Sequence, residues 1–388
     1  MREGWTYKKL GEVCEILNGF AFKSDKYVEQ GIRVLRITNV QKGAIVDNDP
    51  KYYPYDEESN IKQYMLNEND LLMSLTGNVG RVGLLQKGLL PAALNQRVAC
   101  LRLLSDIALL KYLFHLLNSD RFEKDSIFNA AGIAQKNMST EWLKKYVIPI
   151  PPLSEQQRIV SELDLLSSII EMKKAQLKAY DQLSQSIFFD MFGDPVTNEK
   201  GWEVKRLSDV SLEKLSYGSG ASAIPYNESV RYIRITDINE NGELNEDMVS
   251  PNVYDEKYLL DEGDILFARS GATVGKTYCH KSKYGKCMYA GYLIRLVPNK
   301  DIVEPSYVFG YTKTSYYMGF VQKAQNAVAQ PNINAKQYGS LLICIPPLSL
   351  QQSFASKIEA IEKQKSLVQQ SIVETQTMFD YTMDKYFG

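Results

Sequence analysis

The sequence predicts an α+β protein made of two copies of one unit, in which a mixed α/β domain leads into a long helix. Three observations predict this fold: phrases that recur about 195 residues apart, prolines directly before each helix, and two helical segments that each carry one apolar seam. The chain has 388 residues, enough for two domains that each bury a core. We therefore expect a pseudo-twofold duplicated architecture.

The duplication is clearest in phrases that keep nearly the same spacing. "IPIPPLSEQQRIV" begins at residue 148 and "ICIPPLSLQQSFA" at residue 343, an offset of 195, while Trp5 and Trp202 are offset by 197. A repeat this long indicates duplicated domains and not a solenoid of short units. The predicted segments are a first domain at 1–150, a first long helix at 151–193, a second domain at 194–345 and a second long helix at 346–388.

Each repeated proline phrase marks the start of a long helix. Proline lacks the N–H that a helix interior needs and holds the preceding residue extended, so a helix begins just after it. Ser154 and Ser349 are the expected N-caps, and Gln157 and Gln352 follow three residues later, where a capping box has Glu or Gln. Both phrases therefore predict a strand end, a proline stop and a helix start.

The two helical segments share an apolar seam whose spacing alternates between four and three residues. Neither segment contains an internal proline or glycine, and each helix would be about 55–60 Å long at 1.5 Å per residue. We expect the two seams to pair as an antiparallel coiled coil, the alternative being two helices packed separately on their own domains. The predicted seam contains Ile159, Leu163, Leu166, Ile170 and Leu177 in the first helix and Phe354, Ile358, Ile361, Val368 and Ile372 in the second.

Charge is balanced overall but uneven along the chain. There are 45 basic and 46 acidic residues, unlike the basic excess of many nucleic-acid binders. Residues 41–70 hold seven acids and three bases, and 71–105 hold four bases and no acid. In the second repeat, 237–264 hold ten acids and one base, and 265–300 hold seven bases and no acid. The matched asymmetry favours one basic, anion-facing surface per domain over a merely solvated face.

Two glycine-bearing loops, "SLTGNVGRVG" and "ARSGATVGKT", lie in the basic stretches. The second resembles a phosphate-binding loop, but three residues separate Gly271 from Gly275, where that motif needs four. One interpretation is a tight turn between strands, and the other is a turn that presents Arg81 or Lys276 to a phosphate.

Residues able to support catalysis or bind a metal are sparse. His115 lies on an apolar helical segment, where a core histidine is expected, and Cys279, His280 and Cys287 fall short of the four ligands of a closed zinc site. None of the hydrolase, metalloprotease or methyltransferase motifs is present. We therefore predict a binding protein that is not an enzyme and holds no metal.

The phrase Ala-Gln-x-Asn precedes both proline phrases. Gln135 and Asn137 align with Gln330 and Asn332 at an offset of 195. Amide side chains suit adenine edges or phosphates, but Asn137 and Asn332 equally suit a structural turn that caps the next segment. Both interpretations stay open at this stage.

In their order and duplication, these phrases resemble the specificity subunit of type I DNA restriction-modification systems. The resemblance covers essentially the whole chain. It implies two target recognition domains that each read half of a split DNA sequence, with the two helices setting the spacing. It also implies two methyltransferase subunits, which bind adenosylmethionine and methylate adenine, and motor-nuclease subunits that use ATP. This chain itself would hold no cofactor.

The resemblance gives the basic stretches a partner, double-stranded DNA. Different loops in the two domains, such as "AFKSDKYVEQ" and "SGASAIPYNES", predict an asymmetric bipartite target. The residues that we expect near DNA are Arg81, Arg97, Gln135 and Lys136 in the first domain and Arg269, Lys276, Lys323 and Gln330 in the second.

Two other classes of function remain open. A nucleotide-dependent enzyme would use the Gly271–Thr277 loop, and a structural coiled-coil adaptor would make no DNA contact. Scattered cysteines, no signal peptide and no apolar run long enough for a membrane span predict a soluble, cytoplasmic protein without a membrane partner.

Overall fold

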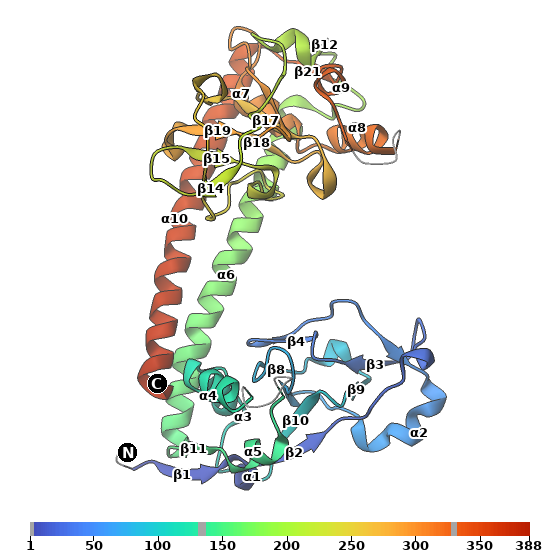
Figure 1. Cartoon of the computed structure of the whole chain (residues 1–388), viewed down its shortest axis with the longest axis vertical. Helices are drawn as coiled ribbons and strands as arrows, with labels where there is room; N and C mark the ends of the chain where they lie inside the picture. The colour runs from blue at the N-terminus through green and yellow to red at the C-terminus, as the bar shows by residue number, and fades with distance from the viewer. Residues whose placement is uncertain (1–3, 131–136, 327–331) are drawn as a thin grey trace. The chain divides into compact units, whose positions relative to one another are not determined.

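The computed structural model describes residues 4–130, 137–326 and 332–388 (Figure 1). The chain divides into two compact units. Unit 1 comprises residues 1–172 and 371–388, and unit 2 comprises residues 173–370. Each unit therefore contains one domain and one end of each long helix. Within the described residues, no helix is long and apolar enough to cross a membrane.

The first domain, in unit 1, is built on an antiparallel four-stranded sheet in the order β2-β10-β7-β8. A three-stranded sheet, β6-β3-β9, contains one parallel pair, and β1 pairs with β11 at the domain's end. The strands are β1 Thr6–Lys9, β2 Cys14–Asn18, β3 Ile32–Leu35, β4 Val40–Gln41, β5 Ala44–Ile45, β6 Tyr52–Tyr53, β7 Leu71–Ser74, β8 Val82–Leu84, β9 Ala92–Leu94, β10 Val98–Leu103 and β11 Val147–Ile150. The helices are α1 Leu10–Val13, α2 Glu58–Ile61, α3 Leu110–Leu117, α4 Asp120–Ala130 and α5 Thr140–Lys145.

The second domain, in unit 2, repeats the main sheet in the order β13-β20-β17-β18. The pair β12-β21 repeats β1-β11, and the parallel pair β15-β19 repeats β3-β9. The strands are β12 Glu203–Arg206, β13 Ser216–Tyr217, β14 Ala223–Pro225, β15 Arg231–Ile233, β16 Val249–Pro251, β17 Ile265–Ala268, β18 Thr277–Cys279, β19 Cys287–Tyr289, β20 Leu293–Leu296 and β21 Leu342–Ile345. The helices are α7 Pro305–Tyr311, α8 Ser315–Asn326 and α9 Ala335–Gly339.

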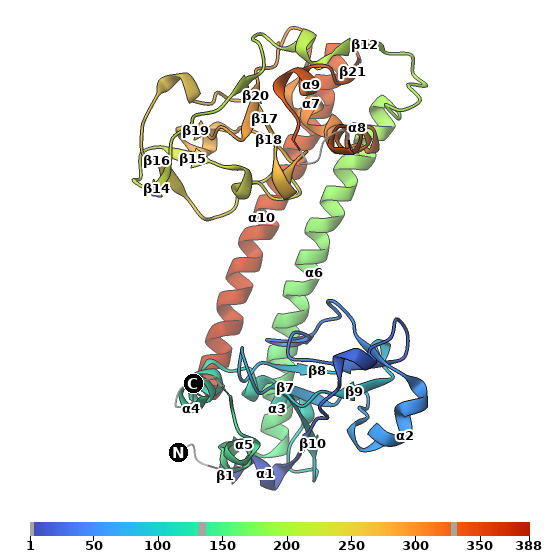
Figure 2. The same ribbon diagram turned by 45° about the vertical axis from the view of Figure 1, so that its right-hand side comes forward.

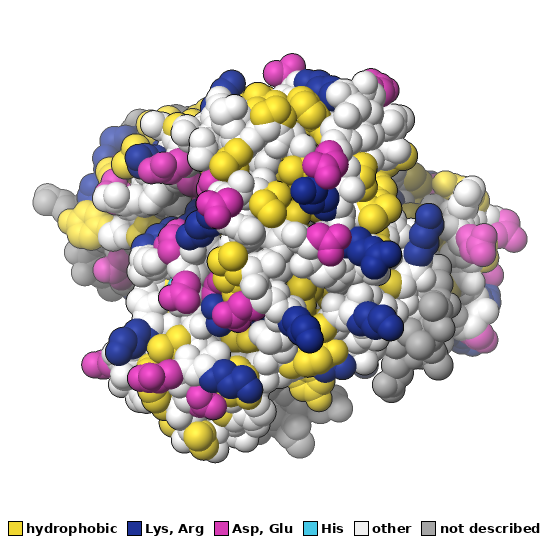
Figure 3. All heavy atoms as spheres, turned by 90° about the horizontal axis from the view of Figure 1, so that it is seen from above, with side chains coloured by type: hydrophobic (Ala, Val, Ile, Leu, Met, Phe, Trp, Pro, Cys, Tyr) yellow, Lys and Arg dark blue, Asp and Glu magenta, His cyan; other side chains and the backbone are white. Residues whose placement is uncertain are grey.

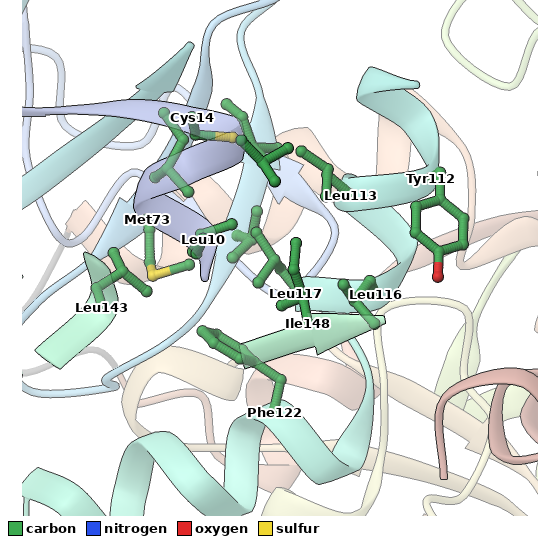
Figure 4. Packing of buried hydrophobic residues seen from close by; sticks show 14 of the residues in the cluster. Leu10, Cys14, Met73, Tyr112, Leu113, Leu116, Leu117, Phe122, Leu143 and Ile148 are labelled. Atoms are coloured by element: carbon green, nitrogen blue, oxygen red, sulfur yellow. The ribbon is translucent and has the colours of Figure 1, made fainter. Parts of the chain in front are cut away.

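Each domain has a core between its main sheet and its helices. Figure 4 shows Leu10, Met73, Leu117 and Ile148 converging from α1, β7, α3 and β11, and all four are at most 1% exposed. In both units the hydroxyl of a fully buried tyrosine donates to the last strand of the domain: Tyr112 to the Pro149 carbonyl at 2.9 Å, and Tyr307 to the Cys344 carbonyl at 2.6 Å.

The long helices are α6, Leu153–Phe192, and α10, Leu348–Phe387, each drawn without a break in Figures 1 and 2. In unit 1, the start of α6 meets the end of α10, where the Tyr386 hydroxyl donates to Glu162 at 2.8 Å. In unit 2, the end of α6 meets the start of α10, where the Phe192 and Phe354 ring centroids are 5.2 Å apart. Both units therefore pair the helices antiparallel, and the chain has the predicted fold class.

The residues predicted for the seam are the shielded face of these helices. Ile159, Leu163, Leu166, Ile170, Phe354 and Ile361 are buried, whereas Leu177, Ile358, Val368 and Ile372 are half-buried. Neighbouring positions such as Leu165 and Met172 are about 60% exposed, at 60% and 62%.

The predicted helix caps are wrong by two residues, because the proline carbonyl accepts the first helical hydrogen bond. α6 and α10 begin at Leu153 and Leu348, so Ser154 and Ser349 lie inside the first turn. The carbonyl of Pro152 accepts from the Gln156 amide at 3.0 Å, which closes the first turn two residues earlier than a cap at Ser154 would.

Of the residues that the two phrases share, the first glutamine makes the most extensive contacts. Gln156 is fully buried; its Oε1 accepts from the Leu109 amide at 2.7 Å, and its Nε2 donates to the carbonyls of Ile107 and Pro151, both at 2.8 Å. Gln351 is also fully buried and bonds the three equivalent groups, at Glu304, Ile302 and Pro346, at 2.8–3.1 Å. One side chain therefore fastens each long helix to its domain, because it satisfies three backbone groups that would otherwise be buried unpaired.

Candidate nucleic-acid interface

The two glycine-bearing loops are tight turns between strands. The first joins β7 to β8 and the second joins β17 to β18. Gly77, Gly80, Gly271 and Gly275 all have positive φ, between 68° and 80° for three of them and 87° for Gly275. A phosphate-binding loop opens a helix, whereas Thr277 begins strand β18 here. The nucleotide interpretation of Gly271–Thr277 is therefore wrong.

A helix covers each turn and explains its second glycine. A Cβ on Gly80 would lie 2.9 Å from the Ser126 Cβ on α4, and one on Gly275 would lie 2.7 Å from Val321 on α8. Neither distance is sterically allowed, so any larger residue would push the helix off the turn. The Tyr317 hydroxyl also donates to the Gly275 carbonyl at 3.0 Å, which holds the second turn in place.

Arg81 and Lys276 occupy equivalent positions at the end of these turns, and both are half-buried. The Arg81 guanidinium donates to the Gln41 side chain. Lys276 Nζ lies 3.0 Å from Glu240 Oε1 and 3.3 Å from the Ile238 carbonyl. Both cations are therefore held by their own domain, and Glu240 partly neutralises Lys276.

Arg97 and Arg269 lie at the same end of the main sheet in their two domains, but they flank different strands. Arg97 directly precedes β10, and Arg269 directly follows β17. Arg97 is exposed, and its carbonyl accepts from the Leu75 amide at 2.9 Å. In unit 2 the equivalent bond runs from the Arg269 amide to the Tyr292 carbonyl at 3.1 Å. Arg269 thus takes the place of Leu75, and Tyr292, which is 62% exposed, takes the place of Arg97. Each domain presents one arginine here, from a different strand.

The asparagines of the two Ala-Gln-x-Asn segments lie beside these strands. Gln135, Lys136 and Gln330 lie outside the described residues. Asn137 forms a β-bridge with Thr76, and Asn332 forms one with Ser270, directly beyond β7 and β17. The asparagines are not the caps of the next helices.

Those caps are other residues. The Ser139 hydroxyl accepts from the Trp142 amide at 3.1 Å, and the Asn334 side chain accepts from the Gln337 amide at 2.9 Å. Asn332 instead accepts from Arg269 Nε at 3.2 Å. The interpretation in which these asparagines cap the next segment is therefore wrong, and the Asn332 side chain serves an arginine instead.

Lys323 is exposed on α8, and its counterpart in the first domain is a residue that sequence reasoning missed. Phe128, 195 residues earlier on α4, is 86% exposed. An apolar residue in a helix is usually assigned to the core, so the sequence alone gave it no special role. Alignment of the two repeats would have indicated it, because a core position would not carry lysine in the other copy.

The uneven charge along the chain is partly used inside the domains. Asp70 pairs with Arg102 at 2.6 Å, and Asp264 pairs with Arg295 at 2.8 Å. Asp264 is 2% exposed, and this burial raises its pKa even though Arg295 opposes the shift. Arg102 and Arg295, which belong to the base-rich stretches, therefore have a structural role. On the face drawn in Figure 3, Lys and Arg side chains are intermixed with Asp and Glu side chains.

Metal and redox chemistry find no support among the described residues. No three His, Cys, Asp or Glu side chains there are grouped as metal ligands. Burial raises the pKa of the Cys279 thiol to about 12 and that of Cys287 to about 11, which keeps both protonated at neutral pH. His280 is buried with its Nδ1 3.1 Å from the Tyr278 hydroxyl.

His115 is the core histidine that the sequence predicts. It is 3% exposed, and its Nε2 lies 2.9 Å from Asp164 on α6. Burial lowers the pKa of His115, although Asp164 opposes the shift. The buried ring is therefore neutral at pH 7, and its Nε2–H donates to the Asp164 carboxylate.

These features define a class of protein with two related domains. Each domain presents one arginine at the same end of its main sheet, and each joins a long helix through one buried glutamine. The model of the type I restriction modification DNA specificity domain matches residues 2–179 and again residues 199–377. The chain therefore belongs to this family of specificity subunits.

Similar proteins with established names are also specificity subunits. The EcoAI specificity subunit of Escherichia coli is 33% identical over 184 residues, which are 46% of this chain and 31% of that protein. The EcoBI specificity subunit of Escherichia coli is 22% identical over 393 residues, 93% of this chain and 80% of that protein. The stretch matched in the first of these is thus about one third of that relative's length.

Two solved structures share the fold. The S subunit of a type I restriction-modification system from M. genitalium superposes with a TM-score of 0.57 at 15% identity, covering 99% of this chain and 96% of that one. A chain from a structure that describes complex assembly and conformational transition of the type I R-M system gives a TM-score of 0.56 at 19% identity, covering 100% and 98%. At these identities the likeness concerns the fold.

Proposed function

We propose that this chain is the DNA-recognition subunit of a type I restriction-modification complex and reads an asymmetric bipartite target. The observation that carries the proposal is that two copies of one framework present different side chains at equivalent positions. Arg97 before β10 and Phe128 on α4 in the first domain correspond to Tyr292 before β20 and Lys323 on α8 in the second. Different chemistry on equivalent surfaces suits two different half-sites.

The chain acts without catalytic groups of its own in this proposal. Two methyltransferase subunits bind adenosylmethionine and methylate adenine, and motor-nuclease subunits use ATP. Adenine must leave the duplex to be methylated, so the pocket for it belongs to the partner, and this chain determines where the partner is placed. The two long helices set the number of unread base pairs between the half-sites.

The eight predicted contact residues remain part of the proposal, and the structure ranks four of them. Arg97 and Lys323 are exposed, whereas Gln41 holds Arg81 and Glu240 holds Lys276. We expect the exposed pair to contribute more to the salt dependence of DNA binding than the held pair, because a paired cation releases fewer counterions from the phosphates.

The test measures DNA affinity against salt for the chain assembled with a methyltransferase subunit from its own genome. K323A should weaken binding to all sequences alike and lower the salt slope by about one. K363A is the matched control, since Lys363 lies on α10, is 71% exposed and pairs only weakly with Glu359. Equal salt slopes for K323A and K363A would exclude Lys323 from the interface.

A further inference from the structure

One arginine of the second domain is fixed by two neighbours. The Arg269 guanidinium carbon lies 4.7 Å from the centre of the Tyr217 ring, and Arg269 Nε donates to Asn332 Oδ1 at 3.2 Å. These residues come from three parts of the chain: Tyr217 ends β13, Arg269 follows β17, and Asn332 lies before α9. The ring and the amide together determine where the guanidinium plane points.

Hydrogen bonds to the backbone fix the side chain and the segments that position Arg269. The Tyr217 hydroxyl accepts from the Ala335 amide at 3.1 Å, and the Ile333 amide donates to the Arg269 carbonyl at 2.8 Å. Tyr217 is 42% exposed and Arg269 is half-buried, so the cluster lies at the surface with its backbone inside the domain. An arginine fixed in this way loses little side-chain entropy on binding.

The fixing contacts leave one edge of the guanidinium unused. Asn332 takes Nε, and in the part of the chain that the structure describes neither Nη atom has a hydrogen-bond or ion-pair partner. Two parallel N–H donors on one edge match the O6 and N7 acceptors that guanine presents in the major groove. A phosphate accepts any nearby cation and does not need this fixed orientation.

We propose that Arg269 reads one guanine of the half-site recognised by the second domain, with Asn332 and Tyr217 as its positioning residues. This inference rests on the proposed DNA-recognition function. It assigns the asparagine of the second Ala-Gln-x-Asn segment to the orientation of an arginine and not to direct contact with adenine.

The first domain lacks this arrangement. Asn18 stands where Tyr217 does, because each pairs with the equivalent residue of the next strand, and Leu75 stands where Arg269 does. Asn137 is retained but has no arginine beside it in the equivalent place. The assigned guanine therefore belongs to only one half-site.

The experiment compares methylation motifs of the chain assembled with its methyltransferase subunit. R269K keeps the charge and loses the paired donors, so we expect the preference for guanine at one base pair to fall by about 5- to 150-fold with the other positions unchanged. Y217F keeps the ring and should retain the motif, whereas Y217L and N332A should weaken the preference at that same base pair. N332D retains the acceptor for Nε and should restore it. Thermal unfolding of each variant confirms that it is folded.

Three results would overturn the inference. An unchanged motif in R269K excludes base reading by Arg269. Uniform loss of methylation on every sequence in R269A, with R269K active and unchanged, makes Arg269 a phosphate contact. If the unaltered assembly shows no sequence-specific methylation or DNA binding, the proposed function fails and this inference fails with it.

Discussion

Gln156 in unit 1 and Gln351 in unit 2 bond the same three backbone groups. Outward-facing positions differ instead, with Arg97 and Phe128 in the first domain and Tyr292 and Lys323 at the equivalent positions of the second. The first kind of position is fixed by chemistry, because no other side chain of this shape combines an acceptor oxygen with two N–H donors. The second kind of position is free to change, because a solvent-exposed side chain has no buried partners to satisfy. Duplication thus preserved the joint between domain and helix while the surfaces diverged.

A second difference lies where each domain faces its helices. Unit 1 has His115 bonded to Asp164, whereas the equivalent of His115 in unit 2 is Gly310. A Cβ on Gly310 would lie 3.1 Å from the Phe188 ring and 3.2 Å from the Phe354 ring. A cavity of about 450 Å³ opens beside Gly310, lined in part by Lys313 and Lys365. The equivalent place between domain and helices thus holds a buried imidazole in unit 1, and a cavity bordered by lysines and aromatic rings in unit 2.

The equivalence of the two joints predicts equal damage when either is removed. Q156A and Q351A should each lower the free energy of unfolding of their own unit by about 2–5 kcal/mol, since each leaves buried backbone groups unpaired. Hydrogen exchange of peptides from each unit measures the two effects separately. Q157A and Q352A, at exposed neighbouring positions, are the controls and should change little. A large effect of Q156A with a negligible effect of Q351A would break the equivalence.

We expect replacement of Lys365, which lies at the helix seam, to lower the stability of unit 2 alone. Lys365 lies 2.9 Å from Asp181 and 3.1 Å from Glu243, and its side chain is 13% exposed. Burial opposes ionisation, but the hydrogen bond to Asp181 and the charges of Glu362 and Glu243 raise the pKa of Lys365. K365M should therefore lower the free energy of unfolding of unit 2 by about 2 kcal/mol, because it leaves these carboxylates without their cation.

The control for this variant lies two residues away. Lys363 pairs with Glu359 at 2.9 Å in an exposed position, and K363M should change stability by less than about 0.5 kcal/mol. High salt should narrow the difference between K365M and the unaltered chain. If K365M and K363M unfold alike by urea titration, the network contributes nothing specific to unit 2.

A smaller effect, of opposite sign, is expected at Lys313. Burial lowers the pKa of its ammonium to about 8, below the ordinary value near 10.4. Between about pH 8 and pH 10.4 the unfolded chain binds more protons at Lys313 than the folded chain does. The free energy of unfolding of the unaltered chain therefore rises with pH across this interval. K313M should be more stable by about 1 kcal/mol at pH 7, and its advantage should shrink across that interval. An advantage that stays constant in melting curves from pH 7 to 10.4 would exclude the buried charge as its cause.

The repeat length, the paired helices and their seams could be predicted from the sequence because each depends on local pattern. Helix periodicity and proline stops are properties of neighbouring residues. The part of the proline phrase that matters most could not be predicted, since Gln156 and Gln157 are adjacent and identical. Only the folded domain decides which of them points at Ile107 and Leu109 and which points at solvent.

The sequence names candidate contact residues but not their pairing. The base-rich stretches contain Arg81, Arg97, Arg269 and Lys276, but Arg102 and Arg295 in the same stretches serve buried carboxylates. Such pairings join residues 31 and 32 positions apart and leave no local pattern. The supports of Arg269 are more distant still, with Tyr217 and Asn332 contributed by segments that meet only in the folded domain.

The most direct test of the proposal that two separate surfaces read DNA across a helical spacer is the methylation motif of a chain with lengthened helices. Seven helix-forming residues would be inserted after Ala175 in α6 and after Gln370 in α10, positions that are equivalent in the two repeats. Seven residues add about 10 Å to a helix at 1.5 Å each, which is about three base pairs at 3.4 Å. We expect the unread spacer to lengthen by about three base pairs while both half-sites keep their sequences. An unchanged spacer in a folded, active complex would contradict the proposal, and so would an altered half-site.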